Sequence, residues 1–64
     1  MWIKAHFVDN GDVIWLQTQN IAAVYPDQGN SKYRGQTVIQ FLGDETNYLR
    51  VKESVNEIGE QIIY

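Results

Sequence analysis

The sequence lacks cysteine altogether and has one histidine and one proline among its 64 residues. Without cysteine there are no disulfides and no thiolate metal sites, and a single histidine does not make a histidine-based zinc site. We therefore expect no metal and no cofactor. A domain of this length hides only about 60% of the surface of its unfolded chain and usually needs such supports. Self-association is the support that remains, so we expect a homodimer or higher oligomer.

Long hydrophobic runs are missing as well. No segment approaches the ~20 apolar residues that a membrane-spanning helix needs. Residues 1–7 lack the long apolar core of a signal peptide. We expect a soluble cytoplasmic protein with no membrane partner.

Positive charge is scarce. Five Lys and Arg residues stand against eight Asp and Glu residues, which gives a net charge of −3. This balance disfavours nucleic acid as a partner, because nucleic-acid binders normally carry a basic footprint. A local basic patch can still oppose the net sign, so nucleic acid stays open as an alternative.

What the sequence does contain is strand and turn chemistry. Hydrophobic residues make up 44% of the chain and charged residues 20%, which is typical of a globular protein, and the length predicts one domain over residues 1–64. Asn10-Gly11 at the centre of a two-residue turn predicts a hairpin in which His6 lies opposite Trp15. In that register one face of the hairpin is apolar and is expected to form the core: Ile3, Ala5, Phe7, Ile14 and Leu16.

The rest of the chain continues this pattern. A long loop is expected from Pro26 to Gly35, where turn-forming residues gather. Face matching then favours a loop of three or five residues after the fourth strand, with Ile39 opposite Leu49. The expected strands cover residues 2–8, 12–17, 21–25, 36–42 and 47–52.

The C-terminal segment predicts a helix over residues 55–62. Ser54 and Glu57 fit a capping box, in which each side chain accepts a hydrogen bond from the backbone of the other. Val55, Ile58 and Ile62 form one apolar stripe at helical spacing. The predicted fold class is α+β, mainly β: about five antiparallel strands in a meander or small barrel-like sheet, closed by a short C-terminal helix. Whether that helix packs on its own sheet or on a neighbouring subunit stays open.

The run Val51-Lys52-Glu53-Ser54-Val55-Asn56-Glu57-Ile58 resembles the ends of small FlbD-like bacterial and phage proteins, which commonly read V-K-E-S-V-E-E-V. This resemblance implies a small β-domain with a terminal helix and no catalytic residue. The order of elements is also similar to that of the carbon storage regulator family and to the end of the LytTR type of DNA-binding domain. Both similarities concern architecture alone.

Aromatic and basic residues are expected together on the outward side of the sheet. Tryptophan, tyrosine and arginine are enriched in protein interfaces, and tryptophans on a solvent face are unusual for a monomer. The alternatives are a surface that stacks nucleic-acid bases, or a sheet that curls and buries both sides. The candidate interface residues are Trp2, Lys4, His6, Trp15, Tyr48 and Arg50, with Lys52 at the end of the same outward side.

The long loop gives a second candidate site, made of Lys32, Tyr33 and Arg34. Long loops in short chains often carry function, although this one is equally well read as a flexible hairpin end. The acidic residues fall at turns and on the helix, where turn and surface chemistry explain them.

No catalytic or cofactor motif is present, so we expect no enzyme. The expected function is a small protein–protein interaction module that acts as a homo-oligomer and binds itself and a host or cellular protein. A phage or mobile-element protein that inhibits or adapts a host factor fits this description. The alternative is a small RNA- or DNA-binding regulator that uses the aromatic and basic sheet face, including Arg34 and Lys52.

Overall fold

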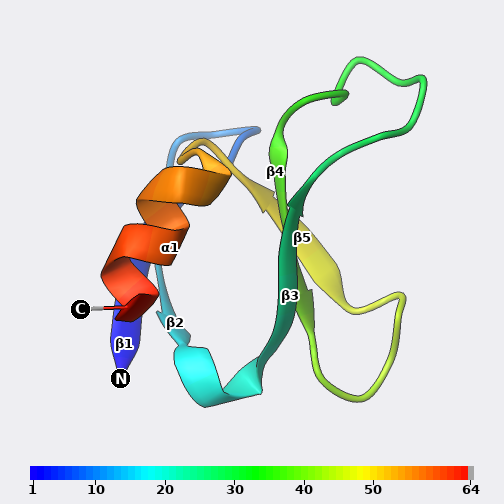
Figure 1. The fold of residues 1–64 in the computed structure, drawn as a ribbon. Coiled ribbons are helices and arrows are strands. Elements are labelled where there is room, and N and C mark those ends of the chain that lie inside the picture. The colour runs from blue at the N-terminus through cyan, green and yellow to red at the C-terminus, as the bar shows by residue number, and fades with distance from the viewer. Residues whose placement is uncertain (64) are drawn as a thin grey trace.

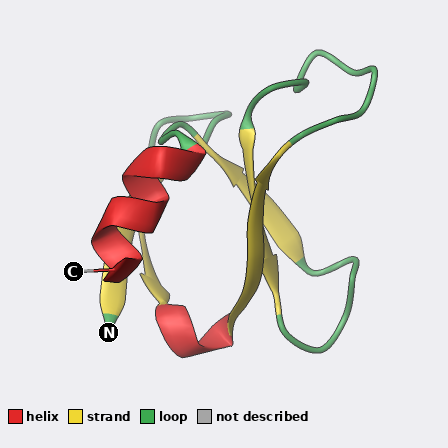
Figure 2. Cartoon of the chain, in the orientation of Figure 1, coloured by secondary structure: helices red, strands yellow, loops and turns green. Residues whose placement is uncertain are grey.

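Five antiparallel strands in two sheets and one C-terminal helix form the fold in the computed structural model, which describes residues 1–63 (Figure 1). The expected α+β class, mainly β, is confirmed. A short 3-10 helix, η1, leads from the first sheet into the second (Figure 2). The elements are β1 (Trp2–His6), β2 (Val13–Gln17), η1 (Thr18–Asn20), β3 (Ile21–Pro26), β4 (Thr37–Phe41), β5 (Tyr48–Val51) and α1 (Val55–Ile63).

β1 and β2 pair two residues away from the expected register. His6 lies opposite Val13 rather than Trp15, and Lys4 lies opposite Trp15. A shift of two residues keeps the two faces of each strand, because side chains alternate with a period of two. The expected core face is therefore preserved, and three of its members are buried: Ile3, Ala5 and Leu16.

The turn explains the shift. A two-residue turn centred on Asn10 and Gly11 needs a positive φ at both positions. Only Gly11 has one, at 76°. The chain makes a wider turn instead, in which the Phe7 N–H donates to the Asp12 carbonyl at 2.9 Å and the Gly11 N–H donates to the Phe7 carbonyl at 3.0 Å. Both strands are therefore shorter at their turn ends than the expected ranges 2–8 and 12–17.

The second sheet has the order β3-β4-β5. The Phe41 N–H donates to the Asn47 carbonyl at 2.9 Å, which extends the pairing to the residue just before β5 and leaves the five residues 42–46 as the turn. Ile39 lies opposite Leu49, as expected from face matching. The hydrophobic pattern thus set this register correctly.

The two sheets join where β1 and β5 end. The Lys52 N–H donates to the His6 carbonyl at 2.9 Å, and the Val8 N–H donates to the Arg50 carbonyl at 3.3 Å. These bonds flank a single β-bridge between Phe7 and Val51. The strands therefore curve around one core (Figure 1), which consists of Ile3, Ala5, Leu16, Ile39, Val51 and Ile58.

α1 packs on β1 and β3 of its own chain (Figure 1). Its capping box is confirmed: the Glu57 N–H donates to Ser54 Oγ at 3.0 Å, and the Ser54 N–H donates to Glu57 Oε1 at 3.3 Å. A helix of nine residues is not stable alone, so its buried Ile58 supplies the packing that holds it. Gln61 adds two hydrogen bonds of 2.9 Å to the backbone N–H and carbonyl of Lys4. No helix within residues 1–63 has the length and apolar character needed to cross a membrane.

Candidate protein-interaction surface

The outer face of the β1–β2 hairpin carries both tryptophans of the chain. Trp2 is 62% exposed and Trp15 is 59% exposed. Lys4 lies between them, opposite Trp15 and two residues after Trp2, with its ammonium 5.9 Å from the centre of the Trp15 ring. Val13, which is also exposed, precedes Trp15 by two residues and so projects to the same side. We call Trp2, Lys4, Val13 and Trp15 the hairpin face.

The hairpin face is an unusual surface for so small a chain. Single exposed apolar residues are ordinary, whereas contiguous apolar surface of large side chains on a monomer marks an interaction site. The lysine does not interrupt it, because its ammonium lies over a ring in cation–π geometry. The surface therefore offers two large aromatic side chains and one cation to a partner.

His6 is the remaining outward residue of β1, and Glu53 holds it. Glu53 Oε2 lies 2.6 Å from His6 Nδ1, and Oε1 accepts the backbone N–H of His6 at 2.8 Å. Burial of the carboxyl, which is 15% exposed, raises its pKa, but the hydrogen bonds from His6 outweigh this and hold the pKa of Glu53 below its usual value. The expected cross-strand pair of His6 with Trp15 is wrong. His6 instead fastens β1 to the segment that leads into α1.

Tyr48 and Arg50 lie on β5, in the other sheet, where Arg50 is half-buried. Its Nε donates to Asp27 Oδ2 at 2.9 Å, and its guanidinium carbon lies 4.5 Å from the ring centre of Tyr33 and 5.3 Å from that of Tyr48. Hydrogen bonds from the Gly29 N–H and from Arg50 hold the pKa of Asp27 below its usual value. The charge of Arg50 is therefore paired within the chain, with the Asp27 carboxylate and two aromatic rings.

The long loop, residues 27–36, is closed by its own backbone. The Asp27 N–H donates to the Gln36 carbonyl at 2.7 Å, and the Gly35 N–H donates to the Asp27 carbonyl at 2.9 Å. Gly35 has a φ of 88°, which favours glycine at this position. Together with the Asp27–Arg50 ion pair, these bonds tie the base of the loop to β5.

The three candidate residues of the loop have different surroundings. Tyr33 is half-buried against Arg50. The Lys32 ammonium lies 5.1 Å from the centre of the Tyr33 ring. Arg34 is exposed and donates to Asn30 Oδ1 at 3.4 Å. Only Lys32 and Tyr33 of these three are therefore drawn into one cluster with Arg50.

The structure thus divides the expected outward set into two groups. Trp2, Lys4 and Trp15 come together on the hairpin, while Tyr48 and Arg50 join Tyr33 on the second sheet. Three residues escaped sequence reasoning: Val13, Glu53 and Asp27. Val13 could have been predicted from the sequence, because its spacing of two from Trp15 places it on the same face. Glu53 and Asp27 were not, because their partners His6 and Arg50 are 47 and 23 residues away.

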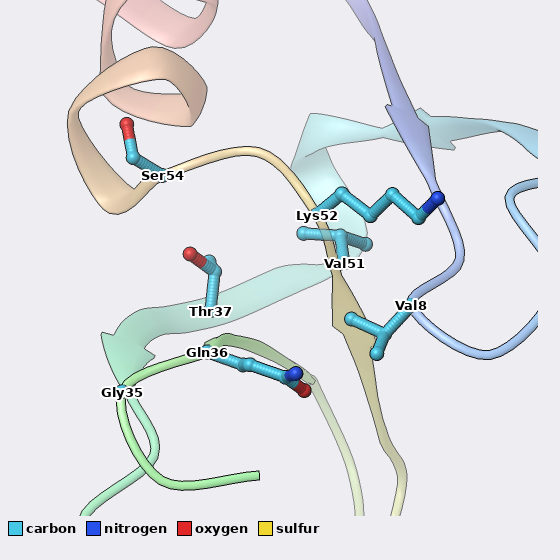
Figure 3. A pocket seen from close by; sticks show the side chains of 7 residues that line it. All are labelled: Val8, Gly35, Gln36, Thr37, Val51, Lys52 and Ser54. Atoms are coloured by element: carbon cyan, nitrogen blue, oxygen red, sulfur yellow. The ribbon is translucent and has the colours of Figure 1, made fainter.

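A pocket of about 410 Å³ lies beside the start of α1, lined by Val8, Gly35, Gln36, Thr37, Val51, Lys52 and Ser54 (Figure 3). Gln36 Oε1 is buried there without a hydrogen-bond partner among the described residues. Figure 3 shows the Gln36 side chain extending toward Val8, and Lys52 extending away from Thr37 and Ser54. These polar groups therefore do not converge on one point.

Asp44 is an acidic side chain that stabilises a turn. Asp44 Oδ1 accepts the Thr46 N–H at 2.9 Å and the Thr46 hydroxyl at 2.8 Å, which hold the pKa of Asp44 below its usual value. Within the described part of the chain, no three His, Asp or Glu side chains are grouped so as to hold a metal ion.

Comparison of the chain with protein-family models, with curated proteins and with solved structures gave no match. The resemblance to FlbD-like proteins stays a prediction. Among the surfaces described above, the hairpin face is the one whose apolar side chains are most exposed.

Proposed function

We propose that this protein is a non-enzymatic protein–protein interaction module that acts as a homo-oligomer, with the hairpin face as its contact surface. The observation that carries the proposal is the joint exposure of Trp2 and Trp15 on one face, at 62% and 59%. Tryptophan is the residue most enriched among interface positions that dominate binding energy. A surface that must stay in water gains nothing from two such side chains.

The size of the chain supports the same proposal. A 64-residue domain buries a small core and is marginally stable by itself. A whole tryptophan buries about 150–250 Å², so covering the exposed parts of two of them contributes several kcal/mol at about 25 cal/mol per Å². That gain must exceed the entropy lost on association, about 4–15 kcal/mol, so the hairpin face needs further contacts beside the tryptophans.

Binding of nucleic acid fits these observations less well. The basic side chains that such a surface needs are divided between two sheets, and Arg50 is paired with Asp27. On the hairpin face, Lys4 is the only cation, and the chain as a whole carries a net charge of −3. Nucleic acid is therefore an outcome to be tested rather than the proposal.

Light scattering across a dilution series tests self-association. We expect the mean mass to fall toward that of the monomer on dilution. Trp15→Ala is expected to weaken association by about tenfold or more, the usual effect of truncating a dominant interface residue. Leu42→Ala is the matched control, because Leu42 is also 59% exposed but lies in the loop after β4. This control should leave association unchanged.

Two results would contradict the proposal. One is a constant monomer mass at every concentration up to the solubility limit. The other is tight binding to nucleic acid that falls steeply with salt and is lost in Lys4→Gln, because that pattern reports phosphate contacts. Circular dichroism of Trp15→Ala provides the folding check, since loss of one cross-strand pair costs the hairpin at most about 1 kcal/mol.

A further inference from the structure

The outer edge of β2 consists of backbone groups that the described part of the chain leaves unpaired. In an antiparallel pair, alternate residues bond to the partner strand and the others point away. The Phe7–Asp12 and Thr18–Met1 hydrogen bonds fix which residues bond inward, so Ile14 and Leu16 face β1. The amides of Val13, Trp15 and Gln17 consequently point outward, and so do the carbonyls of Val13 and Trp15. These groups have no partner in residues 1–63.

The far edge of β1 and the edge of β3 are protected, and β5 is bonded to the first sheet through its Arg50 carbonyl. On the far edge of β1, Gln61 bonds both backbone groups of Lys4. At His6, the backbone N–H donates to the Glu53 carboxylate, and the carbonyl accepts from the Lys52 N–H. β3 has a register irregularity between Ile21 and Ala23 and ends on a proline, two features that natural proteins use to blunt an edge.

β2 has none of these protections. Its sequence, VIWLQ, contains no charge and no proline, and its pairing with β1 is regular over all five residues. An uncharged, regular edge strand is a template for pairing with another strand. The edge also adjoins the hairpin face, because Val13 and Trp15 belong to both. Backbone pairing and aromatic contact are therefore available to a partner at the same place.

We propose that β2 pairs antiparallel with β2 of a second copy, with the two Trp15 residues opposite each other. The inference rests on the proposed self-association and specifies its geometry: a four-stranded sheet in the order β1-β2-β2-β1. This register overlaps all five residues of both strands. Val13 of each copy then lies opposite Gln17 of the other, so the Trp15 and Gln17 amides meet the Trp15 and Val13 carbonyls across a two-fold axis.

A second copy suits this edge better than an unrelated strand. The edge is self-complementary in this register, as an isologous contact requires. The strand itself is uncharged, so two chains of net charge −3 approach without placing like charges opposite each other in the new pairs. Aromatic pairs opposite each other in a sheet contribute about 0.2–1 kcal/mol beyond the backbone bonds. The Trp15 pair is therefore the centre of the contact.

The area sets the strength of the contact. The exposed parts of Trp2, Val13 and Trp15 from two copies amount to roughly 700 Å² of apolar surface, taking about 150–250 Å² for a whole tryptophan. Edge pairing covers only part of this surface, because side chains stand perpendicular to a sheet. Specific stable interfaces bury about 1,200–2,000 Å², so this contact falls below that range, among the weak and transient ones. The dimer is therefore expected to exchange with monomer at accessible concentrations, which makes it measurable by dilution.

Amide hydrogen exchange, followed by NMR on the unmodified protein at high and low concentration, tests the pairing directly. The amides of Trp15 and Gln17 should exchange about tenfold or more slowly in the concentrated sample, because they donate to the Trp15 and Val13 carbonyls of the second copy. The amides of Ile14 and Leu16 are the internal control, because they bond to β1 in monomer and dimer alike. Concentration-independent exchange at Trp15 and Gln17 would overturn the proposed pairing.

Engineered thiols test the register, and because the chain has no native cysteine only the introduced thiols can be cross-linked. We expect Val13→Cys mixed with Gln17→Cys to form a dimer with a short thiol-to-thiol cross-linker, because positions 13 and 17 lie about 5.5 Å apart between Cα atoms across such a pair. Each variant alone places its two thiols about 14 Å apart, at about 3.4 Å per residue along the strand, and should stay uncross-linked.

The outcomes separate the two proposals. Slowed exchange with cross-linking confined to the mixture supports the edge pairing. A chain that self-associates by light scattering, yet shows neither effect, retains its function as a homo-oligomer and loses this geometry. A chain that stays monomeric at all concentrations loses both.

Discussion

Glu53 illustrates how one carboxylate secures a strand. It accepts two hydrogen bonds from His6, one from the backbone and one from the ring. Because the pKa of Glu53 is lower in the folded chain than in the unfolded chain, the unfolded chain binds more protons in acid. The stabilisation is therefore complete above the ordinary carboxyl pKa of 4.5 and is lost as the pH falls through the lowered pKa of the folded chain.

We predict that Glu53→Gln lowers the free energy of unfolding by about 1 kcal/mol at neutral pH, as expected for removal of a charge-assisted hydrogen bond. Urea denaturation at a series of pH values measures the effect. The difference from the unmodified chain should shrink as the pH is lowered below the folded pKa of Glu53. Asp27 and Asp44 also have lowered pKa values and remain in both proteins, so their contribution cancels in the difference. A difference that is constant from neutral to acid pH would contradict this account.

Two glycines predict opposite effects of the same substitution. Gly59 lies within α1, and a methyl group added there meets no atom within 4 Å. We expect Gly59→Ala to raise the free energy of unfolding by about 1 kcal/mol, the difference in helix propensity. Gly11→Ala should lower it, because φ is +76° and the added carbon would lie 3.2 Å from Lys52 Nζ. Chemical denaturation of the two variants measures both signs, and a stabilised Gly11→Ala would refute the turn geometry.

At the scale of elements, one residue of β5 contacts the loop 27–36 at two points. Arg50 pairs with Asp27 at its base and lies against Tyr33 near its middle. We predict that Arg50→Gln releases the loop, so that trypsin cuts after Lys32 and Arg34 faster than in the unmodified chain. Lys52→Gln is the matched control, since Lys52 is the next outward residue beyond β5 and is exposed. Equal cleavage rates in Arg50→Gln and Lys52→Gln would show that the loop is held by its own backbone bonds alone.

The features of helices and strands that depend on residues near one another in the sequence could be predicted, and those that depend on the detailed backbone conformation or on distant contacts could not. The capping box lies within four residues, and the structure has both of its hydrogen bonds. The faces of the first hairpin were correct because a strand alternates every two residues, but its register was wrong because Asn10 does not take the positive φ that the expected turn needs.

The candidate surface follows the same division. Trp2, Lys4 and Trp15 share a face by alternation alone, so the sequence sufficed to place them together. Arg50 was expected on the open surface, but it is half-buried against a loop whose residue Asp27 lies 23 residues away in the sequence. The free edge of β2 was also hidden from the sequence. It emerges only when Gln61 and Glu53 are seen to occupy the corresponding groups of β1.

At the scale of the whole molecule, folding and self-association should be linked. Anything that binds the folded chain and not the unfolded chain stabilises it by mass action, and a second copy acts in this way. The net stability of a domain is small, about 0.05–0.15 kcal/mol per residue, so even a weak dimer adds a measurable fraction. The thermal midpoint of this chain should therefore rise with protein concentration.

We predict that Val13→Lys abolishes this dependence. Val13 is exposed, lies at the free edge and faces Gln17 of the second copy in the proposed pairing, so a lysine there places a charge into the new contact. The substitution removes no core packing, and the midpoint of the dilute sample should change little. Gln28→Lys, in the exposed loop, adds the same charge away from the hairpin and controls for net charge. Calorimetry across a hundredfold range of concentration should show a rising midpoint for the unmodified chain and for Gln28→Lys, and a constant one for Val13→Lys. If Val13→Lys keeps the dependence of the unmodified chain, association uses a surface other than the β2 edge.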